Sequence, residues 1–208
     1  MQLTSVPVDR ARFTYVPMPI GGHFNNRAIS EAAETDSGRF NVWGNSFPAG
    51  HLPKPSSRIE VAGVPFDFPA PTAAGDNIRC AGQVITLPPG RYDWLHLLTA
   101  AERRSEDTIA LHFTHGDVDF EALRVSDFWA APARFGEQLA YVTGDMHYPH
   151  HVQSGLSALM WCQRVPVTRG QPLTGIRLPR NIAIHVFALT LQSAVVQAPG
   201  PEPREARS

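Results

Sequence analysis

Three histidines lie close together within residues 144–155, GDMHYPHHVQSG. They are His147, His150 and His151, with Tyr148 among them. An imidazole near neutral pH can bind a metal or exchange protons, so a divalent metal is a candidate cofactor and these histidines are its candidate ligands. The spacing is not that of a closed zinc site, and neighbouring strand residues point to opposite faces. The stretch is either such a site or a polar loop whose histidines bond to the backbone, and the spacing favours the loop.

A second group of histidines lies inside runs of β-type residues: His96, His112 and His185. If their strands are neighbours and their side chains share a face, they line one concavity suited to a metal or to acid–base chemistry. The simpler interpretation is that each is a hydrogen-bonded core residue, which is common for a histidine among Leu and Ala. If the protein is an enzyme, we expect the catalytic residues to be His96, His112, His147, His151 and Glu102.

The segment 102–107, ERRSED, joins two strongly apolar runs. Arg103 or Arg104 could hold a carboxylate or sugar hydroxyls, whereas a solvated connection with paired charges is the structural interpretation, and the pattern favours the latter. Arg124 and Asp127 either form an ion pair that fixes a loop or lie at the edge of a cleft.

Several aromatic side chains could stack on a sugar ring, whose C–H faces pack against flat π surfaces. Trp94 and Trp161 lie at the centres of strand-like runs and are predicted to be core residues. Trp43 and Trp129 flank loops and are the better candidates for ligand binding. The predicted ligand-binding residues are therefore Trp43, Trp129, Tyr148, Arg103, Arg104 and Arg124.

Positioning these residues requires a β framework, and the stretch 76–129 provides its centre. It contains three β-type runs, 83–87, 92–99 and 108–113, each followed by a turn signal. The run 92–99 is apolar on both faces, which is typical of a strand in the middle of a packed sheet. Further strand-like runs occur at 58–68 (a hairpin), 118–125, 139–143, 159–167, 173–178 and 182–191.

With 19 prolines, 16 glycines and almost no helical period, these runs predict an all-β fold, an antiparallel β-sandwich or jelly roll with long irregular loops. We expect an arm over residues 1–39 that wraps the body, one sandwich domain over 40–192, and a disordered Pro-rich tail over 193–208. The Asp76-Asn77 pair is predicted to hold backbone together through hydrogen bonds and not to react.

Charge and composition limit the classes of partner. The 208 residues carry 18 basic and 19 acidic side chains, a net charge of −1, so nucleic acid and membranes are not expected partners. Cys80 and Cys162 are predicted to be buried and unbridged, and no phosphate-binding loop, nucleophile elbow or CxxC motif is present. The N-terminal segment lacks the apolar core of a signal peptide, which predicts a cytoplasmic protein, and the sequence leaves the oligomeric state open.

Several segments together resemble the non-catalytic β-sandwich accessory domain of actinobacterial glycoside hydrolases such as α-mannosidases. They are FNVWGNSFPA at 40–49 with Leu52-Pro53, GVPF at 63–66 with Pro69, Asp76-Asn77-Ile78 with Gly82-Gln83, residues 95–101, and VSDFW at 125–129. The resemblance covers less than half of the chain. It implies a jelly-roll-like sandwich that holds carbohydrate.

Three functional interpretations remain open. The first is a protein that binds a carbohydrate or glycoside, as the resemblance implies. The second is a small-molecule enzyme of the cyclase, isomerase or lyase type, with a histidine-lined pocket and a possible role for metal, because carbohydrate-module-like folds also serve as cyclases. The third is a structural or interaction subunit, which would present a large apolar face and no pocket.

Overall fold

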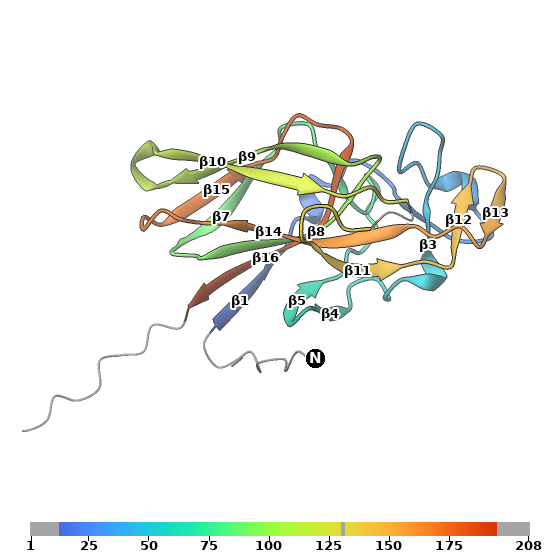
Figure 1. Ribbon diagram of the computed structural model, residues 1–208, viewed down its shortest axis with the longest axis horizontal. Coiled ribbons are helices and arrows are strands. Elements are labelled where there is room, and N and C mark those ends of the chain that lie inside the picture. Colours follow the sequence, from blue (N-terminus) through green and yellow to red (C-terminus); the bar gives the residue numbers. More distant parts are fainter. Residues whose placement is uncertain (1–12, 130–131, 195–208) are drawn as a thin grey trace, which may run out of the picture.

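Two antiparallel sheets face each other in the computed structural model, which describes residues 13–129 and 132–194 (Figure 1). The larger sheet has the order β1-β16-β8-β14-β11, with β6 also paired to β16. Its strands are β1 (Phe13–Met18), β6 (Ile78–Arg79), β8 (Trp94–Ala101), β11 (Gln138–Val142), β14 (Leu159–Pro166) and β16 (Ile184–Ala194). The smaller sheet has the order β10-β9-β15-β7, formed by β7 (Val84–Gly90), β9 (Ser105–Phe113), β10 (Val118–Val125) and β15 (Leu173–Arg177).

The strand β8 shows why the larger sheet is buried on both sides. Every residue from Leu95 to Ala101 is buried. Because strand side chains alternate between faces, Leu95 and Leu97 pack into the core between the two sheets, whereas Leu98 and Ala100 pack into a second core on the opposite face. The sheet therefore needs a further layer to cover that opposite face.

Irregular segments between residues 24 and 68 and around residues 128 and 146 supply this third layer. Their aromatic residues Phe40, Phe47, Phe66, Phe68 and Phe128 are all buried in the second core. The layer contains the short strands β2 (Ile29–Ser30), β3 (Phe47–Pro48), β4 (Arg58–Val61), β5 (Val64–Asp67), β12 (Asp145–Tyr148) and β13 (His151–Ser154). It also contains the 3-10 turns η3 (Thr35–Ser37) and η4 (Ala49–His51), while η2 (Gly21–His23) and η5 (Thr114–Gly116) lie elsewhere.

The predicted sandwich is confirmed, and each long strand-like run in the sequence becomes a strand. Two local expectations are wrong. The predicted turn at 88–90 is part of β7, which is an edge strand, where prolines are tolerated because no ladder hydrogen bond is lost. The predicted loop at 144–155 is the β12–β13 hairpin, in which Tyr148 pairs with His151.

The sheets extend beyond the expected domain bounds. The strand β1 lies in the predicted arm 1–39 and pairs with β16 along its full length. The strand β16 continues to Ala194, and the rest of the predicted tail lies outside the described residues. No helix within residues 13–129 and 132–194 is long and apolar enough to cross a membrane.

Candidate functional site

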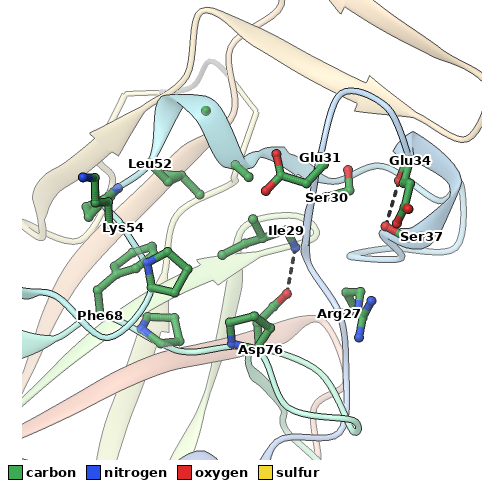
Figure 2. A pocket seen from close by; sticks show the side chains of 16 residues that line it. Arg27, Ile29, Ser30, Glu31, Glu34, Ser37, Leu52, Lys54, Phe68 and Asp76 are labelled. Atoms are coloured by element: carbon green, nitrogen blue, oxygen red, sulfur yellow. Dashed lines mark hydrogen bonds between the residues drawn. The ribbon is translucent and has the colours of Figure 1, made fainter.

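A cleft of about 450 Å³ opens in the third layer, where three irregular segments meet (Figure 2). The segments are residues 27–37, 49–55 and 68–76, all of which lie on the outer side of the larger sheet. The lining residues are Arg27, Ile29, Ser30, Glu31, Glu34, Ser37, Ala49, Gly50, Leu52, Pro53, Lys54, Pro55, Phe68, Pro69, Pro71 and Asp76. The cleft is therefore built by loops on a rigid β framework, which is the usual location of binding sites.

The cleft wall combines an apolar part and a charged rim. Figure 2 shows Leu52, Ile29 and Phe68 around its interior. Lys54 lies at one end of the cleft, and Arg27 and Glu34 lie at the other. This arrangement offers apolar contact and hydrogen-bonding groups to the same ligand.

The charged rim is open to a ligand. Glu31, Glu34 and Lys54 are exposed. None of these three side chains forms an ion pair within the described part of the chain. Among residues 13–129 and 132–194, these charged groups are therefore not engaged in ion pairs that hold the fold.

Asp76, by contrast, is a structural carboxylate at the base of the cleft. It is 2% exposed, and its two oxygens accept hydrogen bonds from the backbone N–H groups of Ala28 at 2.9 Å and Ile29 at 3.1 Å. Asn77 Nδ2 also donates to Oδ1 of Asp76 at 2.9 Å. Burial raises the pKa of Asp76, and these hydrogen bonds act in the opposite direction. Asp76 thereby fixes β2, which carries Ile29 and Ser30 into the cleft wall.

Ser30 connects the cleft to a buried polar cluster that also contains Ser46 and His147. The Oγ of Ser30 lies 2.8 Å from Nδ1 of His147 and 2.7 Å from Oγ of Ser46. All three residues are at most 3% exposed. Burial lowers the pKa of His147, as does nearby His51, while Asp145 and Glu31 act in the opposite direction, so the imidazole is neutral at pH 7.

The histidines near residue 150 do not form one ligand set. On β12, His147 points inward to Ser30, so Tyr148 faces the other way and stacks on His151 with ring centroids 5.0 Å apart. His150 and His151 are exposed. Within the described residues, no group of three or more His, Cys, Asp or Glu side chains could hold a metal ion.

The prediction that His96, His112 and His185 line one concavity is wrong. His112 is on β9 in the smaller sheet, and its neighbours Leu111 and Phe113 point into the inter-sheet core, so His112 faces away from it. His96 and His185 share a face of the larger sheet but are separated along it, since His96 pairs with Thr190 and His185 with Ala100.

The two remaining histidines of that group have different surroundings. His96 bonds to Gln192 at 2.6 Å and lines a second cavity of about 250 Å³ next to Glu137 and Arg164. His185 is fully buried, with Nδ1 2.8 Å from Oδ1 of Asn77.

Glu102 belongs to the surroundings of His185. It forms an ion pair with Arg79 at 2.5 Å and lies 3.6 Å from Nε2 of His185. Burial raises the pKa of Glu102, but the hydrogen bonds and charges of His185 and Arg79 outweigh burial, so its pKa lies below the usual range. The five predicted catalytic residues therefore do not meet in one pocket.

The predicted ligand-binding residues lie outside the cleft. Trp43 and Trp129 are 60% and 44% exposed. Arg103 and Arg104 are also exposed. Arg124 pairs with Glu106 at 3.2 Å instead of with Asp127. Both cysteines are buried and unbridged, as predicted.

Sequence reasoning missed the residues that line the cleft, such as Ser30, Glu31 and Lys54. They lie in segments without periodicity, and each is an ordinary polar residue in the sequence. Only Asp76 carried a signal, because an Asp-Asn pair at the start of a strand-like run indicates side-chain bonding to backbone.

Comparison with known proteins places the chain in a protein family. A family model described as an AziU2-like beta-sandwich domain matches residues 14–195. No curated protein matches the chain. The match agrees with the sandwich that the resemblance implies, and it provides no link to glycoside hydrolases or to actinobacteria.

Proposed function

The chain belongs to the AziU2-like β-sandwich domain family, and from this premise we propose that it binds a polyhydroxylated small molecule, a carbohydrate or glycoside, in the cleft formed by residues 27–76. The observation that carries the proposal is one cleft in which an apolar wall meets several charged side chains that have no ion-pair partner among the described residues. Sugars present both kinds of surface, since their C–H faces are apolar and their hydroxyls are hydrogen-bonding groups.

The size and chemistry of the cleft suit such a ligand. Its volume of about 450 Å³ lies within the range of roughly 300–1,000 Å³ that is usual for small-molecule sites. Carboxylates such as Glu31 accept hydrogen bonds from hydroxyls, and Lys54 donates to them. The near-neutral chain lacks the basic excess that binding to nucleic acid requires.

Calorimetric titration with neutral and amino sugars, from monosaccharides to short oligosaccharides, tests the proposal. For a sugar that binds, we expect Glu31→Ala and Lys54→Ala each to weaken the affinity about tenfold, equivalent to about 1.4 kcal/mol. Both side chains are exposed, so neither substitution should disturb the fold.

The matched control is Trp43→Ala, which removes the exposed loop aromatic outside the cleft. It should leave the affinity unchanged. Loss of binding in Trp43→Ala but not in the cleft variants would move the site to the loop and overturn the proposed location. Absence of heat across the whole panel would overturn carbohydrate binding itself.

A further inference from the structure

We propose that Ser30 and His147 act as nucleophile and general base, and that they cleave an ester carried by the polyhydroxylated ligand in the cleft. This inference rests on the proposed function in one respect, namely that the same cleft holds the substrate. It adds an activity, acyl transfer to a serine followed by hydrolysis, to what would otherwise be a binding protein.

The first support is the contact between the two side chains. A serine hydroxyl becomes a useful nucleophile when a neutral base lies within hydrogen-bonding reach, about 2.6–3.2 Å. The distance from Ser30 Oγ to His147 Nδ1 is 2.8 Å. In the proposed arrangement His147 carries its proton on Nε2, Ser30 donates to Nδ1, and Ser46 donates to Ser30 across 2.7 Å.

The second support is the rigidity of this arrangement. Ser46 and His147 exchange both backbone hydrogen bonds, at 3.0 and 3.1 Å. The strand β2 pairs with β3, which begins directly after Ser46. Gly38 packs so closely against Ser30 and Ser46 that a Cβ at this position would collide with the Ser46 side chain. Backbone pairing therefore holds nucleophile and base in register, as a preorganised site requires.

The third support is location. Ser30 is one of the residues that line the cleft (Figure 2), whereas His147, which contacts Ser30, is not. A ligand in the cleft would meet the serine first, with the base shielded from bulk water. The titratable groups that influence His147 are His51, Asp145 and Glu31, and of these only Glu31 lines the cleft.

The reaction balances without a cofactor. Ser30 Oγ forms a bond to the ester carbonyl carbon as its proton moves to His147 Nδ1. The bond from that carbon to the alcohol oxygen breaks, and the leaving alkoxide takes the proton from His147. Water then attacks the acyl-serine with His147 again as base, which releases the acid and restores Ser30.

A fluorophosphonate probe tests the pair without knowledge of the natural substrate. Attack by Ser30 forms an oxygen–phosphorus bond, breaks the phosphorus–fluorine bond and sends the proton to His147. Intact-mass analysis of the full chain should show one added label, which peptide mapping places on Ser30. We expect Ser30→Ala to abolish labelling and His147→Gln to slow it about a hundredfold.

The control is Ser57→Ala, which removes a hydroxyl that donates to the backbone carbonyl of Lys54 and does not line the cleft. It should label at the wild-type rate. Labelling in wild type should also rise with pH through a midpoint below that of an ordinary histidine, because the neutral base is required. A purely structural role for the cluster would not produce this profile.

Two results would overturn the inference: no labelling of folded wild type at probe concentrations that label a serine esterase, or equal labelling of Ser30→Ala. Thermal melts show whether each variant is folded, and if His147→Gln is not, Ser30→Ala still decides the outcome. Sugar titration separates this inference from the proposed function. Binding without labelling removes only the esterase activity, and labelling without sugar binding removes only the carbohydrate ligand.

Discussion

At the scale of single residues, Asp76 links the candidate site to the fold. Its carboxylate is buried, which is costly, and it is stabilised by two backbone N–H groups and the Asn77 amide. As predicted, the Asp76-Asn77 pair holds backbone segments together through hydrogen bonds. One of the backbone groups that Asp76 binds, the N–H of Ala28, is 48 residues away in sequence. A local turn pattern can indicate that a side chain bonds to backbone, but it cannot identify such a distant partner.

Asp76→Asn should therefore lower stability while preserving side-chain shape. An amide has one acceptor oxygen, so its NH2 group would face the N–H of either Ala28 or Ile29 and leave that donor without an acceptor. We expect the free energy of unfolding to fall by about 1–3 kcal/mol in urea titrations. The control is Asp67→Asn, which removes an exposed pair with Arg58 and should cost less than about 1 kcal/mol. Equal effects of the two substitutions would contradict this role for Asp76.

At the scale of elements, the turn before β6 determines where Asp76 lies. Gly75 has φ +133°, a conformation that residues with a Cβ rarely adopt. A Cβ at Gly75 would also collide with the backbone carbonyl of Asn26. That carbonyl accepts the N–H of Asp76 at 2.9 Å, so it cannot move away without breaking the contact.

We therefore expect Gly75→Ala to lower the free energy of unfolding by about 2 kcal/mol or more, through backbone strain and steric overlap together. It should also weaken any ligand binding in the cleft, since Asp76 would shift. Gly22→Ala is the matched control, because Gly22 has open space around it and no positive φ. Denaturant unfolding of both variants measures the difference, and a neutral Gly75→Ala would show that the turn can relax.

The strands themselves were largely predictable, because apolar runs with period two must be buried on at least one face. It was harder to predict which face of each strand is buried. On β10, Val118 and Phe120 are exposed, with Phe120 70% exposed, whereas Leu123 and Val125 are buried. The cleft could not be predicted from such patterns. Its walls are irregular segments, and their meeting depends on long-range contacts such as that between Asp76 and β2.

At the scale of the whole molecule, the third layer contains the buried His147 and covers the face of the larger sheet on which His96 and His185 are buried. Burial lowers the pKa of each of His96, His147 and His185, although the hydrogen bond to Gln192 partly opposes this for His96 and the nearby carboxylate of Glu102 does so for His185. Each of these imidazoles has a polar side chain within hydrogen-bonding distance: Gln192 for His96, Ser30 for His147 and Asn77 for His185. The folded protein therefore holds these imidazoles neutral under conditions in which the unfolded chain would protonate them.

This difference predicts that stability falls on mild acidification. Unfolded histidines bind protons below pH of about 6.5, and the folded ones do so only at lower pH, so the free energy of unfolding decreases as pH falls from about 6.5 toward the folded pKa values. Each histidine contributes a slope of at most about 1.4 kcal/mol per pH unit. Urea unfolding at pH 7.5 and pH 5.5 should therefore give clearly lower stability at pH 5.5.

The histidine origin of the slope is tested by His96→Gln, which keeps an amide donor for Gln192 and removes one titrating group. Its stability should depend less steeply on pH between 7.5 and 5.5 than that of wild type. Asp76 acts in the opposite sense, since its raised pKa favours proton uptake by the folded state, so it cannot be the cause of acid destabilisation in this window. An unchanged slope in His96→Gln would exclude His96 as a source of the pH dependence, and equal wild-type stability at the two pH values would contradict the lowered histidine pKa values in the folded state.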